Sequence, residues 1–347
     1  MPEVSIVVPC YNEQATITLL LCALYDQTYP HQKMEIIIAD ALSTDQTRLM
    51  ISSFQLDHAD MQVHIVDNPK RTIPSALNEA IISAQGEYIV RLDAHCVPRP
   101  DYVERCIFAL QEGIGMNVGG VWDIQPGKPQ AMARAIAVAA SHPLGVGDAH
   151  YRHTQIAQYT DTVPFGSFRR DLIQRIGLYD ETLLANEDYE FNTRIRQAGG
   201  KIWLDPQICS TYYARADLVA LAKQYYRYGY WKMRMLFRYP NTLRWRQALP
   251  PLFVLSLLIF AIASFFSSIA LFFFLVEIAL YMLILFLTSF TLAIKRQDGF
   301  LALGVPLAIA TMHLAWGSGF LWCSRTAFVR EHLDSNVLNQ IKHGKQT

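Results

Sequence analysis

A long uncharged apolar stretch near the C-terminal end constrains this chain more than any other feature. Between Pro251 and Ile294 the only charged side chain is Glu277. A stretch of this length is too long for one membrane-crossing helix of ~20 residues and fits two. The serine-rich residues 264–268 mark the expected turn between them. The sequence therefore predicts a membrane hairpin, the alternative being two helices buried in a large soluble core.

A third apolar segment, residues 300–323, follows a charged interruption at 295–298 and is uncharged apart from His313. It contains glycines and a proline, so it either crosses as a kinked helix or enters the bilayer and returns. A full crossing would put the polar tail, residues 325–347, on the opposite side from the rest of the soluble chain. That tail is basic, which conflicts with the positive-inside tendency. The sequence therefore predicts either two or three membrane-spanning helices within residues 250–324.

The segment just before the hairpin, residues 218–249, is basic and aromatic. It contains seven Lys and Arg residues and no Asp or Glu. Such an excess directly before a span marks the cytoplasmic side, and aromatic residues suit helices at headgroup level. A solvated basic helix is the alternative. We therefore expect residues 1–217 to form a cytoplasmic domain of a multi-pass protein of the bacterial inner membrane.

Composition excludes some classes of protein. The chain has 30 Lys and Arg against 30 Asp and Glu, which argues against a globally basic binder of nucleic acid. Its six cysteines form no C-x-x-C pair and show no regular spacing. They read as reduced thiols, not as a disulfide or zinc framework. We expect a membrane partner and no nucleic acid.

Residues 1–115 alternate short β-branched runs with amphipathic stretches, a pattern typical of βαβ units and a mostly parallel sheet. Strands are expected at 4–9, 34–39, 63–66 and 88–92. Polar or acidic residues follow each of them, among them Asp40 and Asp93. The carboxyl ends of parallel strands meet at one edge, where open α/β sheets bind ligands. Ordinary loop polarity is the alternative interpretation.

The motifs narrow the choice of ligand. No G-x-G-x-x-G follows the first strand and no Walker-type lysine loop is present, so neither a dinucleotide nor a P-loop site is supported. A diphosphate would then need a metal or free cations. Asp93 and His95 alternate on an extended segment and can face one divalent ion. Arg91 and the pair at 70–71 are available as counter-charges.

Five segments in this order, residues 4–13, 40–47, 68–78, 93–95 and 186–190, resemble the motifs of family 2 glycosyltransferases with the GT-A fold. The resemblance covers about residues 3–235. Within the family, residues 224–232 are similar to the succinoglycan-type exopolysaccharide enzymes, which add a sugar to a lipid-linked oligosaccharide. The implied architecture is an α/β GT-A domain followed by transmembrane helices. The implied donor is a nucleotide-diphospho-sugar, UDP-glucose in our interpretation.

The resemblance also implies roles for single residues. Four would line the nucleoside pocket: Pro9, Tyr11, Glu13 and Asp40. Arg71 would approach the base or the diphosphate, and Asp93 with His95 would hold Mg²⁺ or Mn²⁺. Asp188 would be the general base that deprotonates the acceptor hydroxyl, with Glu187 beside it. Gln224 and Arg227, which resemble the Q-x-x-R-W motif of processive synthases with Tyr in place of Trp, would lie near the diphosphate.

Chemistry supports the base assignment. A one-step, inverting displacement of a nucleoside diphosphate needs a base opposite the leaving group and a cation to stabilise the departing charge. The alternative for Glu187 and Asp188 is a solvated helix start, where acids are favoured. His95 departs from the family's D-x-D, and imidazole shifts the preference toward Mn²⁺ without excluding Mg²⁺. Arg169 and Arg170 match an anionic lipid diphosphate on the acceptor side.

Two other functions remain open. A polyprenyl-monophosphate sugar synthase would use the lipid phosphate itself as nucleophile and need no general base. A membrane-tethered subunit that binds nucleotide sugar without catalysis would explain the altered D-x-D. With only two or three spans expected, transfer of a single sugar is favoured over extrusion of a polymer.

Overall fold

The computed structural model describes residues 1–343, and side chains as far as Thr326. The chain divides into two compact units, which are described separately. The first comprises residues Met1–Lys128 and Ala140–Ala214, and the second comprises Pro129–Ala139 together with the chain from Arg215 onward. The sequence boundary was expected at 217, and the inclusion of residues 129–139 in the second unit was not expected.

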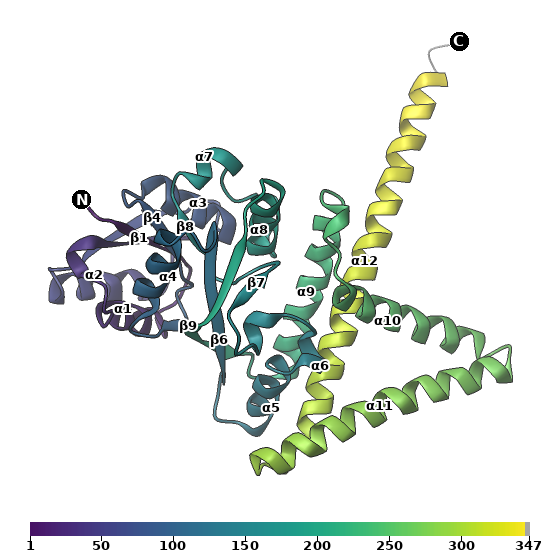
Figure 1. The fold of residues 1–347 in the computed structure, drawn as a ribbon. Coiled ribbons are helices and arrows are strands. Elements are labelled where there is room, and N and C mark those ends of the chain that lie inside the picture. The colour runs from purple at the N-terminus through teal and green to yellow at the C-terminus, as the bar shows by residue number, and fades with distance from the viewer. Residues whose placement is uncertain (344–347) are drawn as a thin grey trace. The chain divides into compact units, whose positions relative to one another are not determined.

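The first unit is built on a nine-stranded mixed sheet in the order β3-β2-β1-β4-β8-β6-β9-β5, with β7 paired to β9 (Figure 1). The strands are β1 Val4–Cys10, β2 Met34–Asp40, β3 Gln62–Asp67, β4 Tyr88–Arg91, β5 Val97–Pro98, β6 Asn117–Pro126, β7 Gln158–Thr160, β8 Ser167–Arg169 and β9 Ile202–Ala214. Strands β1 to β4 are parallel. Strand β8 runs antiparallel to both β4 and β6. The sheet is thus parallel in its first half and mixed in its second.

Helices cover both faces of this sheet. They are α1 Ile17–Tyr25, α2 Thr47–Asp57, α3 Ile73–Ser83, α4 Tyr102–Gln111, α6 Pro143–Val146, α7 Leu172–Ile176 and α8 Glu187–Gln197, with 3₁₀ turns η1 His31–Lys33 and η2 His150–Arg152. Val4, Ile6 and Val8 of β1 lie in one core with α1, α2 and α4. Val7 lies in a second core with α3 and α8. Because both faces of β1, β2 and β4 are buried, these three strands are mainly apolar runs, which makes them recognisable in the sequence.

The second unit is helical. Its elements are α5 Ala131–Ala140, α9 Leu218–Leu236, the 3₁₀ turn η3 Pro240–Thr242, α10 Trp245–Ala263, α11 Ser268–Arg296 and α12 Leu301–His343. Three segments are long and apolar enough to cross a membrane: Trp245–Ala263, Ser268–Arg296 and Leu301–Thr326. The expected turn at 264–268 separates the first two. The helix α12 continues beyond residue 324, where the polar tail was expected to begin, and residues 344–347 lie outside the described part of the chain.

The helix α12 is the most enclosed of the three candidate spans. Within the structure 44% of its most apolar window is buried, against 17% for α10 and 6% for α11. Helix α9 covers part of it at very close range, because a Cβ atom at Gly229 would lie 2.1 Å from the Trp316 carbonyl oxygen. A Cβ at Gly319 would lie 2.1 Å from the carbonyl oxygen of Tyr226. Only glycine allows backbones to approach this closely.

The six cysteines are free thiols, as the irregular spacing predicts. Cys22, on α1, is exposed, and the other five are buried: Cys10, Cys96, Cys106, Cys209 and Cys323. Burial raises the pKa of the Cys106 thiol to about 12. These five thiols therefore pack as small apolar groups.

Candidate functional site

The parallel strands bring polar loops together at their carboxyl ends. Cys10, Asp40 and Asp67 are in register at the ends of β1, β2 and β3. Asp93 and His95 follow the end of β4, which pairs with β1 in parallel. The loops expected to share one edge of the sheet therefore do so.

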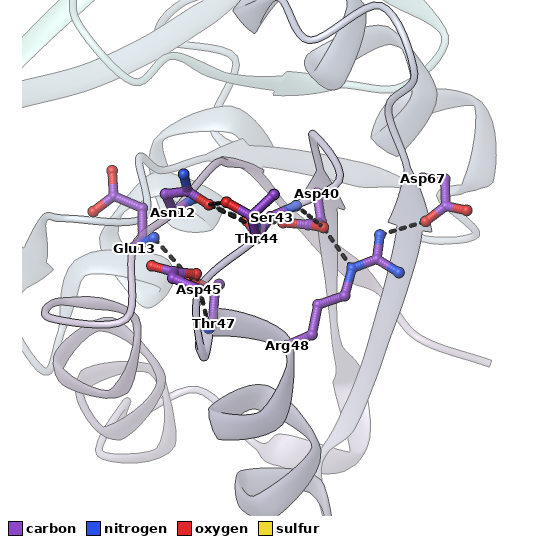
Figure 2. A network of polar contacts seen from close by, with 9 residues as sticks. All are labelled: Asn12, Glu13, Asp40, Ser43, Thr44, Asp45, Thr47, Arg48 and Asp67. Atoms are coloured by element: carbon purple, nitrogen blue, oxygen red, sulfur yellow. Dashed lines mark hydrogen bonds and ion pairs between the residues drawn. The ribbon is translucent and has the colours of Figure 1, made fainter.

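The loops after β1 and β2 are joined by a network of hydrogen bonds (Figure 2). The Asn12 backbone N–H donates to Ser43 Oγ at 2.8 Å, and Asn12 Oδ1 accepts from the Thr44 N–H at 2.8 Å. The Glu13 N–H donates to Thr47 Oγ1 at 2.8 Å. Two segments more than thirty residues apart are thereby held as one surface.

Asp40 lies beneath this surface. Its side chain is fully buried and accepts hydrogen bonds from the Ser43 N–H at 3.0 Å and Ser43 Oγ at 2.5 Å. Arg48 Nε donates to it at 2.5 Å, and the same guanidinium also contacts Asp67 (Figure 2). For Asp40 to accept a hydrogen bond from a nucleoside, as the resemblance implies, this buried side chain would have to become accessible. That contact stays a prediction.

The other residues expected around the nucleoside lie closer to solvent. Tyr11 is 47% exposed, Pro9 is half-buried and Arg71 is exposed. Glu13 is half-buried, and burial raises the pKa of its carboxyl, but hydrogen bonds from His95 and Thr16 outweigh this and hold the pKa below its usual value. Their contacts with a donor remain predictions.

Arg91, the last residue of β4, joins three carboxylates, one from the loop after β4 and two from the first turn of α8. Its side chain is 3% exposed. One terminal nitrogen donates to Asp188. The other lies 3.0 Å from Glu187 Oε1 and 3.2 Å from Asp93 Oδ1. The guanidinium also lies over the ring of Phe165, 5.8 Å from its centroid. Arg91 thereby fastens the N-terminal end of α8 to the loop after β4.

This geometry corrects one expectation. The sequence suggests Arg91 as a counter-charge for a diphosphate, but burial and three carboxylate partners leave it unable to serve a substrate. Instead it positions Asp93 and Asp188, which are 95 residues apart in the sequence, in one site. The sequence offers no local signal for such a pairing, because it depends on how α8 meets the sheet.

Asp188 has an unusual environment. Its side chain is 22% exposed. Burial raises the pKa of the carboxyl to about 7; Arg91 opposes this rise, whereas the nearby charges of Glu187 and Asp93 add to it. A carboxyl with a pKa near neutral pH suits a group that takes up a proton during a reaction.

The donor set after β4 fits a metal that shares its ligands with a substrate. Among the described residues, no three His, Cys, Asp or Glu side chains cluster closely enough to hold a metal by themselves. Asp93 and His95 offer a carboxylate and an imidazole with side chains 22% and 40% exposed. Three carboxylates facing the single guanidinium of Arg91 leave excess negative charge, which a divalent cation would offset. Phosphate oxygens of a bound substrate would complete the coordination.

Arg169 and Arg170 do not reach this edge. Strand β8 is antiparallel to β4, so Arg169 pairs with Tyr88 at the start of β4. Arg169 forms an ion pair with Glu87 at 2.8 Å, and Arg170 donates to the Ala84 carbonyl at 2.7 Å. The reversed strand direction puts both arginines at the opposite edge of the sheet, so the structure does not bring them to the candidate site, and their acceptor role stays a prediction.

Gln224 and Arg227 lie on α9, in the second unit. Gln224 Nε2 donates to the hydroxyl of Tyr228 at 3.1 Å, and Arg227 is exposed. Their expected approach to the donor diphosphate stays a prediction.

Positive φ angles gather around the site. Within the described part of the first unit, the non-glycine residues with positive φ are Asn12, Leu42, Arg71, Phe165 and Asn186. The first three follow β1, β2 and β3, and the other two precede β8 and α8 at the same edge. Such conformations cost about 1–3 kcal/mol each and persist where surrounding contacts enforce them. Their concentration at this edge of the sheet supports its interpretation as the functional site of the first unit.

Comparison with known proteins identifies the class. The family described as Glycosyl transferase family 2 matches residues 5–177. The succinoglycan biosynthesis protein ExoA of Rhizobium meliloti is 30% identical, over 91% of this chain and 93% of that protein. The chain belongs to the family 2 glycosyltransferases, as its motifs predict.

A second relative is 27% identical over 92% of this chain and 96% of its own length. It is the dolichyl N-acetyl-alpha-D-glucosaminyl phosphate 3-beta-D-2,3-diacetamido-2,3-dideoxy-beta-D-glucuronosyltransferase of Methanococcus voltae. Among solved structures, the mannosyltransferase PcManGT from Pyrobaculum calidifontis, in complex with GDP-Man and Mn²⁺, aligns with a TM-score of 0.62. That alignment has 20% identity and covers 90% of this chain and 87% of the other. The predicted GT-A fold and the predicted glycosyltransferase class are confirmed.

Proposed function

We propose that this enzyme transfers a hexose, with inversion, from a nucleotide-diphospho-sugar to a lipid-linked saccharide during bacterial exopolysaccharide synthesis. UDP-glucose is the proposed donor. The observation that carries the proposal is the Arg91 cluster, which joins the loop bearing Asp93 to the helix start bearing Asp188. The guanidinium of Arg91 thus holds both Asp93, on the side of the donor, and Asp188, the proposed base.

Asp188 acts as the base in this proposal. Its carboxylate takes the proton of the acceptor hydroxyl, whose oxygen attacks the anomeric carbon from the face opposite the diphosphate. The bond between that carbon and the diphosphate oxygen breaks, and the leaving nucleoside diphosphate keeps the electron pair. Arg91 holds the carboxylate in place, and Glu187, 3.0 Å from the same guanidinium, keeps the pKa of Asp188 high through its charge.

Asp93 and His95 would hold the divalent cation, Mn²⁺ or Mg²⁺. When bound, that cation supplies positive charge to the diphosphate as it departs. Glu13, whose Oε1 lies 3.1 Å from His95 Nδ1, orients the imidazole.

The lipid-linked acceptor is supported from two directions. The names of both relatives describe work on glycans, and that of the Methanococcus voltae protein describes a dolichyl-linked phosphate substrate. The chain itself has three helices with the length and hydropathy of membrane spans. The basic residues before the first of these helices support a cytoplasmic location for the first unit, at the bacterial inner membrane.

The test replaces Asp188 by Asn in the full-length protein. With UDP-glucose, Mn²⁺ and a defined lipid-linked saccharide, D188N should lower kcat by about 10²–10⁴-fold. The matched control is D171N, which removes an exposed carboxylate at the opposite edge of the sheet. Unchanged transfer by D188N to a polyprenyl monophosphate would instead indicate that the lipid phosphate is the nucleophile. Tight UDP binding by wild-type protein, without turnover on any acceptor, would indicate a non-catalytic subunit.

A further inference from the structure

Within the second unit, helices α9 and α12 border an open groove of about 550 Å³. Residues 222–226 of α9 form one wall, and residues 311–318 of α12 form the other. The close contacts at Gly229 and Gly319 hold the two helices together beside it. The groove is therefore bounded by two tightly packed helices.

The walls of the groove offer mainly hydrocarbon. Ala222, Leu314 and Ala315 contribute apolar side chains. The hydroxyl of Thr311 donates to the Leu307 carbonyl at 2.7 Å within its own helix, which leaves the methyl group of Thr311 to line the groove. Moreover, this wall belongs to the candidate span Leu301–Thr326. A hydrocarbon chain that arrives from a bilayer would find matching surface here.

The α9 wall adds positive charge. Lys223 lines the groove next to Ala222, and α9 contains no acidic residue to neutralise it. An apolar groove with an ammonium group in its wall is complementary to an amphiphile with a hydrocarbon tail and an anionic head. Phosphate and diphosphate esters of long-chain alcohols have this chemistry.

We propose that the groove between α9 and α12 binds the polyprenyl chain of the acceptor lipid, with Lys223 facing its phosphate. This inference rests on the proposed function for the choice of occupant, since a lipid-linked acceptor supplies both the chain and the phosphate. It also assigns the acceptor lipid to residues other than Arg169 and Arg170, which lie at the far edge of the sheet.

The first experiment fills the groove. In the full-length enzyme, A315F should raise the KM for a polyprenyl-diphosphate-linked saccharide about tenfold, the effect of displacing roughly two methylene groups. The KM values for UDP-glucose and for the same saccharide diphosphate on a short alkyl chain should not change. A222F fills the groove from the other wall, and it replaces A315F in this experiment if A315F does not fold.

The matched control is A279F, which makes the same change at an exposed position of α11. An equal rise of KM in A279F, or an equal rise for long and short acceptors, would overturn the proposal. For the charge, K223Q should raise the KM for both phosphorylated acceptors, whereas K295Q, at the exposed end of α11, should not. Unchanged acceptor KM in K223Q would refute the role of Lys223.

A second measurement does not depend on catalysis. Purified D188N protein in nanodiscs is cross-linked with a diazirine-bearing polyprenyl phosphate, and the labelled peptides are sequenced. Labelling within residues 222–226 and 311–318 would support the groove if excess polyprenyl phosphate without the diazirine prevents it. Excess phosphatidylglycerol should not prevent it. Equal displacement by phosphatidylglycerol would indicate ordinary bilayer lipid and overturn it. Specific labelling of the groove, together with a wild-type protein that transfers no sugar to any acceptor, would contradict the proposed function and leave the groove proposal intact.

Discussion

Two arginines at the same edge of the sheet bind carboxylates in very different surroundings. Arg48, 40% exposed, lies between buried Asp40 and Asp67, whose side chain is 64% exposed. Arg91, 3% exposed, is surrounded by three carboxylates whose side chains are 11–22% exposed. The chemical groups are the same, but Arg48 and Asp67 are open to water, whereas every member of the Arg91 cluster is largely shielded from it.

This difference in exposure separates two roles. Water screens the Arg48–Asp67 pair, and the buried Asp40 is bonded to Ser43 as well as to Arg48, so this cluster mainly fixes the shape of the loop after β2. The Arg91 cluster has more negative than positive groups in a poorly hydrated place, so its charges act on one another strongly. A loop of fixed shape suits recognition of a substrate, and a buried cluster with excess negative charge suits proton transfer and metal binding.

The largest expected effect comes from removing each arginine. R91M should abolish transfer and lower the free energy of unfolding by about 3–5 kcal/mol, because buried carboxylates lose their cation. R48M should lower it by less, about 1–3 kcal/mol, since Asp40 is fully buried but keeps its bonds to Ser43. Denaturant titration in detergent compares the two. Equal losses in both variants would contradict the distinction drawn above.

The pH dependence of transfer distinguishes the clusters further. With the pKa of Asp188 at about 7, the base form is lost as the pH falls, so kcat should drop about tenfold per unit below that pH and level off above it. Arg91 lowers this pKa, and the lysine of R91K should hold the carboxylate less well. The fall of kcat on the acidic side of the pH–rate profile should therefore move to higher pH in R91K. R48K should leave it where it is. Initial rates from pH 5 to 9 measure this, and a coincident shift in both variants would count against Asp188 as the titrating group.

The metal side of the Arg91 cluster can be tested separately. H95A should weaken Mn²⁺-dependent binding of UDP-glucose by about tenfold or more, as loss of a metal-site residue does. Binding is followed by calorimetry with Mn²⁺ and again with a chelator. H64A is the matched control, because His64 is an exposed histidine on β3. Wild-type affinity in H95A, the same with and without chelator, would remove His95 from the ligand set.

The smallest effect is expected at the exposed partner of Arg48. D67N should change the free energy of unfolding by about 0.5 kcal/mol or less, since water screens that ion pair. Transfer should continue at the wild-type rate. A large loss of stability or activity would mean that the Arg48 cluster is less screened than its exposure indicates.

The sequence predicts the parallel half of the sheet well and the remaining half poorly. Strands β1, β2 and β4 are buried on both faces, so each forms a short, mainly apolar run that stands out from its neighbours, whereas the edge strand β3 is partly exposed. Strand β8 has only three residues, and nothing local indicates that it runs antiparallel. Its direction nevertheless decides where Arg169 and Arg170 lie, so the sequence could not show that they are away from the candidate site.

The candidate site shows the same limit. Asp93, His95, Glu187 and Asp188 were found because they follow a strand end or match a motif. The role of Arg91 was missed because it depends on a contact between residues 91 and 188 that no spacing rule describes. In the second unit, length and hydropathy identified the candidate spans, but not that α9 packs closely on α12, since this contact depends on Gly229 and Gly319.

The cysteine pattern gives the native chain a built-in reporter of orientation. Maleimides react with thiolates, and burial withholds five of the six thiols from the reagent. A membrane-impermeant maleimide at neutral pH should therefore label Cys22 alone, and only from the side of the bilayer that the first unit occupies. If the first unit is cytoplasmic, as proposed, inverted membrane vesicles should be labelled and intact cells should not, with no mutation needed in the protein.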